Sequence, residues 1–203
     1  MSDTIHFETE GPIAVIVIDN PPVNTGSWSV RKGLLDAVMK FSNDASLTAA
    51  VIIGKDKNFI SGSDLKEFGK PITPPELPQV IEAIEKCPKP IIAAISGATL
   101  GGGYELALGC DARLAAGNTI VGLPEVTLGM LPGAGGTQRL PRLIGLTKSI
   151  QVICSGKRYT ANEALKLGMI DAIAEGDLRP FAVKFAKTAL KNPLSSKNVE
   201  KDQ

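Results

Sequence analysis

Histidine and cysteine, the side chains that most often hold metals or form catalytic pairs, are scarce in this sequence. It has one histidine, His6, and three cysteines, Cys87, Cys110 and Cys154. A single histidine beside the start of the chain argues against Ser-His-Asp triads, Cys-His pairs and histidine-ligated zinc. The cysteines are odd in number and widely spaced, which is typical of free thiols in a reducing compartment. We therefore expect neither a metal site nor a disulfide framework.

An excess of charge of one sign is also missing, and aromatic side chains are few. The 203 residues include 22 Lys and Arg, 21 Asp and Glu, and 4% aromatic residues. Balanced charge gives no reason to expect attraction to nucleic acid or to an anionic membrane surface. Few aromatic side chains leave little for unpaired bases to stack on. We expect no nucleic-acid partner.

Long apolar runs are absent as well. The nearest candidate, residues 91–109, contains five glycines and Glu105, whereas a membrane-spanning helix needs about 20 consecutive apolar residues. The first residues show no basic stretch followed by an apolar one, so no secretory signal is visible. We expect one domain of a cytoplasmic or organellar protein without a membrane span.

Short apolar runs alternate with helical patterns along the chain. β-branched and apolar runs bounded by Gly, Pro or Asn predict strands, at residues 14–19, 49–54, 90–95, 111–116, 119–122 and 170–174. Apolar spacing of three and four residues predicts helices, at residues 29–41, 76–86, 104–110, 137–143, 146–155, 161–167 and 180–191. Ser29 is the expected N-cap of the first helix, and Thr160 with Glu163 forms a capping box. Strand–helix alternation of this kind predicts an α/β fold with parallel strands.

A triple glycine, residues 101–103, stands between the apolar strand 90–95 and a helical segment that carries Glu105. Glycines at such a turn let a ligand approach the backbone, and the first N–H groups of a helix are unpaired and partly positive. This geometry suits an oxyanion. Tight strand–helix packing would explain the glycines equally well, so this stretch alone leaves both interpretations open.

A second glycine turn and a second carboxylate strengthen the first interpretation. Gly62-Ser63 follows the buried strand 49–54 and offers further backbone donors, and Glu125 follows a proline where another strand ends. Two partly buried carboxylates can be pushed to different pKa values, so that one accepts a proton while the other donates one. Each glutamate by itself could also be an ordinary helix-start or surface charge. The charged residues 64–67 read as a solvated turn, and Tyr104 reads as a packing residue.

Three segments in order, residues 59–66, 98–107 and 123–139, resemble the core motifs of the crotonase, or enoyl-CoA hydratase/isomerase, superfamily. The resemblance extends over about residues 13–190. Residues 20–24 and 109–111 look most like the N-terminal hydratase part of multifunctional fatty-acid β-oxidation enzymes. The later part of those enzymes is an NAD-dependent 3-hydroxyacyl-CoA dehydrogenase.

The resemblance implies a crotonase-like spiral of ββα units that binds an acyl-CoA thioester. The backbone N–H groups of Ser63 and Gly102 would form the oxyanion hole. Family members usually have alanine where Ser63 stands, and we expect serine to be tolerated because the main chain does the work. Further residues expected to bind CoA or substrate are Ile60, Ser61, Gly62, Asp64, Leu65 and Gly133.

The resemblance also assigns Glu105 and Glu125 as the catalytic pair. They would hold the water that adds to a 2-enoyl-CoA, one removing a proton from it and the other helping to protonate the α-carbon. The same pair could shift a 3-enoyl to a 2-enoyl bond, with Glu125 as the main proton shuttle. Two alternatives stay open: another crotonase-fold reaction such as thioester hydrolysis or decarboxylation, and a non-catalytic acyl-CoA-binding module.

The chain ends sooner than stand-alone hydratases do. We expect a crotonase-fold domain at residues 1–192 without the complete C-terminal helical part, followed by a polar linker or tail at 193–203. The sequence then reads as a fragment of a multifunctional enzyme, either forming a homo-oligomer or covalently linked to a dehydrogenase domain. No cofactor is expected, since acyl-CoA is the substrate and NAD would belong to the dehydrogenase part. The expected location is the bacterial cytoplasm, or a peroxisome or mitochondrion in a eukaryote.

Overall fold

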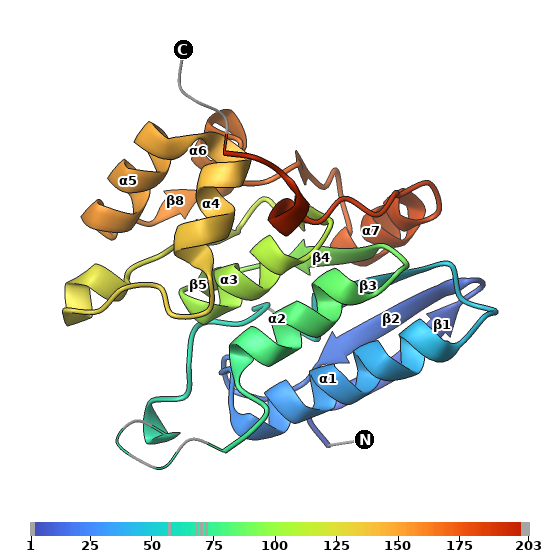
Figure 1. Cartoon of the computed structure of the whole chain (residues 1–203). Helices are drawn as coiled ribbons and strands as arrows, with labels where there is room; N and C mark the ends of the chain where they lie inside the picture. Colours follow the sequence, from blue (N-terminus) through green and yellow to red (C-terminus); the bar gives the residue numbers. More distant parts are fainter. Residues whose placement is uncertain (1–2, 57, 68, 70, 72, 200–203) are drawn as a thin grey trace.

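The computed structural model describes residues 3–56, 58–67, 69, 71 and 73–199, apart from the side chain of Leu65 (Figure 1). Its larger sheet has six strands in the order β1-β2-β3-β4-β6-β9. They are β1 (Ile5–Glu10), β2 (Ile13–Ile18), β3 (Ala49–Gly54), β4 (Ile91–Ile95), β6 (Ala112–Ala115) and β9 (Ala172–Ile173). β1 pairs with β2 antiparallel, and every other pairing in this sheet is parallel.

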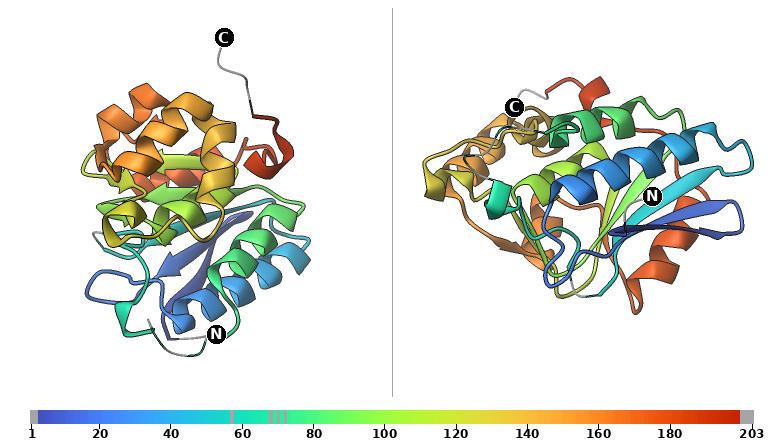
Figure 2. Two further views of the ribbon diagram at one scale, coloured as in Figure 1. Left: turned by 60° about the vertical axis from the view of Figure 1, so that its left-hand side comes forward. Right: turned by 90° about the horizontal axis from the view of Figure 1, so that it is seen from below.

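The central strands are buried on both faces. Every residue of β2, β3 and β4 is buried, as their uniform Val, Ile and Ala composition predicts for parallel strands covered on both sides. On one face, Ile16 and Ile52 join the core under α1 (Trp28–Asn43), α2 (Leu77–Lys86) and α3 (Gly102–Gly109). On the other face, Val15 and Val51 pack with α7 (Leu178–Ala186). Figure 2 shows α7 on the opposite side of the sheet from α1 and α2.

A smaller sheet contains β5 (Ala98–Leu100), β7 (Ile120–Gly122) and β8 (Tyr159–Thr160). Consecutive strands divide between the two sheets: β4 belongs to the larger and β5 to the smaller, and β6 and β7 repeat this division. A helical segment follows each pair, α3 after β5, and η2 (Glu125–Leu128) with α4 (Gly136–Ile144) after β7. The chain therefore advances as a spiral of ββα units, in which the starts of α3 and η2 both come from the smaller sheet.

The remaining helices lie at one end of the molecule. α4, α5 (Leu146–Ser155) and α6 (Ala161–Leu167) gather beyond the smaller sheet (Figure 1). Thr160 caps α6, accepting from the N–H of Glu163 at 3.4 Å, while its own N–H donates to Glu163 Oε2 at 2.9 Å. The predicted capping box is confirmed. None of the helices in the described part of the chain is long and apolar enough to cross a membrane.

Several predicted element boundaries are wrong. The first helix begins at Trp28 with Ser27 as its N-cap, not Ser29, and the two serine hydroxyls lie 2.9 Å apart. The last helix ends at Ala186 rather than at 191. Beyond it, Lys191 and the N–H of Asn192 bind the buried carboxylate of Asp111.

Three strands escaped prediction: β1, β5 and β8. β1 is an edge strand whose outward side chains are exposed, so it lacks the uniform apolar run of its neighbours. β5 has three residues and lies in the glycine-rich segment that precedes α3. β8 has only two residues. All three strands are too polar or too short for their pattern to stand out from a loop.

Residues 193–199 pack on the rest of the chain. Leu194, in η3 (Leu194–Ser196), is fully buried in the main apolar core. Nε of Arg142 donates to the carbonyl of Lys197 at 3.0 Å. The proposed division at residue 192 stays a prediction, but Leu194 and Lys197, which follow it, are in contact with the domain.

Candidate active site

A cavity of about 880 Å³ opens at the N-terminal ends of α1 and α3. Both glutamates and both proposed donors line it: Ser63, Gly102, Glu105 and Glu125. Its volume is in the range of small-molecule sites. The two glycine turns and the two carboxylates noted in the sequence thus line the same cavity.

The residues expected to bind CoA or substrate divide into three groups. Ile60, Gly62, Asp64 and Gly133 line the cavity, and Ser61 is not among the lining residues. The side chain of Leu65 lies outside the described part of the structure.

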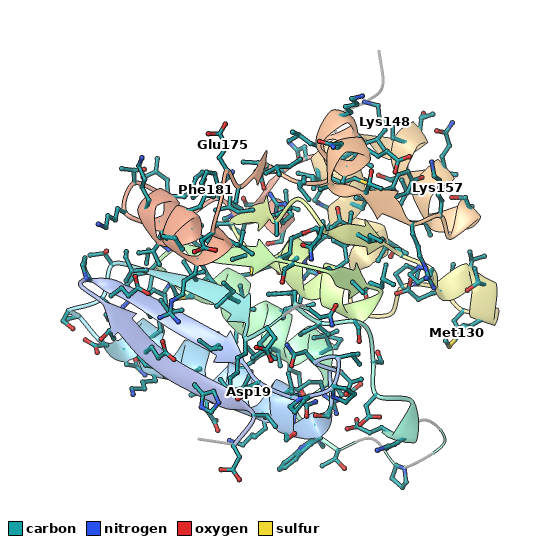
Figure 3. All side chains as sticks on the ribbon, turned by 180° about the vertical axis from the view of Figure 1, so that it is seen from behind. Asp19, Met130, Lys148, Lys157, Glu175 and Phe181 are labelled. Atoms are coloured by element: carbon teal, nitrogen blue, oxygen red, sulfur yellow. The ribbon has the colours of Figure 1, made fainter. Side chains whose placement is uncertain are left out.

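Met130, which was not predicted, also lines the cavity. It lies on the projecting turn after η2 and is 39% exposed (Figure 3).

Glu105 is held in one orientation by the backbone. It lies on α3 and is only 3% exposed. Its Oε1 accepts the N–H of Ala134 at 2.8 Å and that of Gly136 at 2.7 Å. A Cβ on Gly136 would lie 3.0 Å from the same oxygen, so glycine permits this approach. Burial raises the pKa of Glu105, and the two N–H groups oppose that rise without cancelling it.

Glu125 is less constrained. It opens η2 and is partly buried, and its Oε2 is buried with no hydrogen-bond partner in the described residues. Burial raises the pKa of Glu125, and the nearby charge of Glu105 raises it further. An oxygen that has lost water without gaining a partner is ready to accept a hydrogen bond from a ligand or to carry a proton.

The two proposed oxyanion donors lie on neighbouring segments. Ser63 forms an isolated parallel bridge with Gly26 at the entrance to α1. Gly102 is the first residue of α3, where an N–H has no acceptor within the helix. A Cβ on Gly102 would lie 3.5 Å from Ser63 Oγ and 2.8 Å from a methyl carbon of Leu77. A side chain at position 102 would therefore clash with Leu77. Glycine avoids this clash and also lets a ligand approach the backbone N–H closely.

Sequence reasoning missed the contacts that hold one wall of the cavity. Glu67, read as part of a solvated turn, accepts from Nη1 of Arg31 at 2.9 Å and from the N–H of Trp28 at 2.6 Å. Arg31 Nε and Trp28 Nε1 also donate to the carbonyls of Pro75 and Pro74, at 2.9 and 2.8 Å. These partners lie some 36 to 46 residues apart, and no local pattern links them.

Tyr104 is a packing residue, as expected. It is fully buried, and its hydroxyl donates to the carbonyl of Met169 at 2.9 Å. Burial raises the pKa of the Tyr104 hydroxyl well above its ordinary value. Within the described residues, no group of three or more His, Cys, Asp or Glu side chains could hold a metal ion.

Solved structures that superpose on this arrangement of two sheets and helices include crotonase-fold enoyl-CoA hydratases. The enoyl-CoA hydratase of Bacillus anthracis superposes with a TM-score of 0.85 at 33% identity, covering 91% of this chain and 76% of that one. DspI of Pseudomonas aeruginosa gives a TM-score of 0.86 at 32% identity, covering 92% and 80%. The predicted fold class is confirmed.

Sequence comparison identifies the family. The enoyl-CoA hydratase/isomerase profile matches residues 8–202, and the chain belongs to this family. A peroxisomal bifunctional enzyme of Danio rerio is 46% identical over 187 residues, which are 92% of this chain and 26% of that protein. A Bacillus subtilis (strain 168) protein named "Probable enoyl-CoA hydratase" is 39% identical over 188 residues, 86% of this chain and 73% of its own length. The chain thus spans about a quarter of the bifunctional relatives and most of the bacterial one.

Proposed function

We propose that the protein hydrates 2-enoyl-CoA to 3-hydroxyacyl-CoA in fatty-acid β-oxidation and also converts 3-enoyl-CoA to 2-enoyl-CoA. The observation that carries this proposal is the pair of carboxylates, one buried and one partly buried, in one cavity. Glu105 is fixed through one oxygen, and Oε2 of Glu125 has no hydrogen-bond partner among the described residues. Both pKa values are raised by burial, which suits groups that exchange protons near neutral pH.

Hydration would proceed between the two carboxylates and the thioester. One carboxylate removes a proton from the water as its oxygen bonds to the β-carbon, and the electrons of the double bond move to the thioester oxygen. The N–H groups of Ser63 and Gly102 stabilise that negative charge, and each such donor is worth about 3 kcal/mol in comparable sites. The other carboxyl group then protonates the α-carbon, which restores the carbonyl.

Isomerisation uses the same enolate. Glu125, whose Oε2 has no partner in the described residues, removes a proton from the α-carbon of a 3-enoyl-CoA and returns it to the γ-carbon. The double bond moves into conjugation with the carbonyl, and no atom is gained or lost. The oxyanion donors serve both reactions because both pass charge through the thioester oxygen.

The relatives suggest a wider setting for this domain. Peroxisomal bifunctional enzymes match it over 26% of their length, so we propose that it works within a longer chain whose other part oxidises the 3-hydroxyacyl-CoA product. The hydratase step needs no cofactor, and NAD would belong to that other part. A peroxisome or the bacterial cytoplasm would be its location.

Loss of the conjugated-thioester absorbance of crotonyl-CoA tests the reaction. Glu105→Gln and Glu125→Gln should each slow turnover by roughly 10²–10⁴-fold. Glu82→Gln, which removes an exposed carboxylate on α2, is the matched control and should retain full activity. Equal rates in all four proteins would remove the mechanism. Release of free CoA would indicate thioester hydrolysis instead, and calorimetric binding without turnover would indicate a non-catalytic acyl-CoA module.

A further inference from the structure

Ala134 and Gly136, the two residues that bind Glu105, belong to a loop, residues 133–136, that leads into α4. Their N–H groups hold Oε1 of Glu105. Any shift of this loop must therefore move the carboxylate or break its hydrogen bonds. The position of Glu105 depends on what holds loop 133–136.

Arg139, on the first turn of α4, holds this loop from its other side. Its Nη1 donates to the carbonyl of Ala134 at 2.9 Å. Ala134 is thus bound at both polar atoms of its backbone, its N–H by Glu105 and its carbonyl by Arg139. A Cβ on Gly135, where φ is +95°, would lie 2.1 Å from Arg139 Nη1. The loop carries no side chain where the guanidinium passes.

Glu85, on α2, fixes the guanidinium of Arg139 in turn. Nε and Nη2 of Arg139 donate to its two carboxylate oxygens at 2.9 and 2.8 Å. Both side chains are largely buried, at 14% and 11% exposure. Burial raises the pKa of Glu85, but hydrogen bonds from Arg139 and Ser195 more than offset this and lower it overall. Glu85 therefore stays ionised and holds the Arg139 fork in one plane.

We propose that Arg139, held by Glu85, is a positioning residue that fixes loop 133–136 and thereby aims the carboxylate of Glu105 into the cavity. Arg139 is not itself among the residues lining that cavity, so it acts through Ala134 rather than on substrate. The effect on turnover rests on the proposed function, whereas the effect on Glu105 itself does not.

The charge of Arg139 gives this role a second signature. The positive charge of Arg139, from α4, lowers the pKa of Glu105, and the charge of Glu105 raises the pKa of Glu125 on η2. Glu85 on α2 balances Arg139 at close range. Removing the guanidinium takes away the cation, so the pKa of Glu105 should rise and its titration should move to higher pH.

Four variants separate positioning from charge. Arg139→Gln removes the fork and the cation, Arg139→Lys keeps the cation without the fork, and Glu85→Gln leaves the cation but weakens its anchor. Arg142→Gln is the matched control, because Arg142 lies one turn further along α4 and binds the carbonyls of Gln138 and Lys197, outside loop 133–136.

Steady-state rates against pH and the ¹³C NMR titration of the Glu105 carboxyl provide the readouts. Arg139→Gln should lower kcat by roughly 100-fold with little change in KM, and should move the titration of Glu105 upward. Arg139→Lys should lower kcat while leaving that titration near its wild-type position. Glu85→Gln should lower kcat less than Arg139→Gln does and should not move the titration upward, because the cation remains, and Arg142→Gln should match wild type.

The proposal is overturned if Arg139→Gln leaves kcat and the titration of Glu105 unchanged, or if Arg142→Gln has the same effects. If Arg139→Gln does not fold, Arg139→Lys and Glu85→Gln decide the question by kcat: a wild-type kcat in both overturns the proposal. A wild-type protein without hydratase turnover would reject the proposed function alone, because the NMR titration still tests whether Arg139 acts on Glu105.

Discussion

The carboxylate of Glu125 lies directly over Gly101, whose own carbonyl accepts the N–H of Glu105 at 2.9 Å. A Cβ on Gly101 would be 3.1 Å from Glu125 Oε1 and 3.6 Å from its carboxyl carbon. This one glycine thus touches both members of the carboxylate pair, one through its α-carbon and the other through its peptide group.

Gly101→Ala should therefore impair catalysis more than folding alone explains. The φ of +53° at Gly101 disfavours alanine, at a cost of about 1–3 kcal/mol, and the new methyl group would push Glu125 away. Gly11→Ala is the control, because Gly11 has a φ of +60° with no atom within 4 Å of its Cβ position. Both variants should melt at lower temperature, and only Gly101→Ala should lose hydratase turnover. Equal activities would show that Glu125 tolerates displacement.

Glu125→Gln should stabilise the protein at neutral pH. Burial raises the pKa of Glu125 in the folded state, so its contribution to stability is present at low pH and lost as pH rises through that pKa. A neutral amide avoids the loss. The melting temperature should exceed that of wild type at pH 7.5, and the difference should shrink on acidification.

Glu163→Gln should change the melting temperature in the opposite direction. Hydrogen bonds from Thr160 lower the pKa of Glu163 from 4.5 to about 2, so its contribution is present above pH 4.5 and lost as pH falls toward 2. This variant should melt below wild type at neutral pH. A Glu125→Gln protein that also melted lower would contradict the inferred cost of burying that carboxylate.

Arg31→Met should widen or loosen the cavity. It removes the donors to Glu67 and to the carbonyls of Pro75 and Gly26 that hold one wall in place. We expect KM for an acyl-CoA substrate to rise roughly tenfold, equivalent to about 1.4 kcal/mol, with a smaller change in kcat. Lys32→Met, which removes the neighbouring exposed cation, should leave KM unchanged. A fall in kcat alone would argue against a role in the cavity wall.

Asp111→Ala should be strongly destabilising. The buried carboxylate accepts the N–H groups of Ile91 and Asn192 and binds Lys191 Nζ at 3.1 Å, so its loss removes the acceptor of two backbone N–H groups and the counter-charge of Lys191. We expect the free energy of unfolding, measured with urea, to fall by about 3 kcal/mol. Asp36→Ala breaks an exposed pair with Lys32 and should cost at most ~0.5 kcal/mol. Equal decreases in the free energy of unfolding in both variants would show that Asp111 does not stabilise the contact between residues 191–192 and β4.

Features of fold and site that are encoded locally were predictable. Strand 49–54 is uniformly apolar and coincides with β3, and the Thr160–Glu163 capping box needs only four residues. Glu105 and Glu125 stood out because carboxylates are costly in apolar, glycine-rich surroundings, and the structure places both in one cavity.

Contacts between distant segments were not predictable in this way. Arg139 reads as an ordinary helix charge, because its partner Glu85 is 54 residues away. In loop 133–136, glycine admits the Glu105 carboxylate at Gly136 and the Arg139 guanidinium at Gly135. Such roles follow from tertiary packing, which single-residue patterns do not encode.

The two edge strands of the larger sheet, β1 and β9, protect it against aggregation. Strand β1 presents Glu8 and Glu10 outward, and both are paired with Arg179 of α7; at the opposite margin β9 has only two residues. A charged edge strand and a very short edge strand both disfavour backbone pairing with a strand of another molecule. The parallel strands between them, although almost wholly aliphatic, are thereby protected from growing into intermolecular sheets.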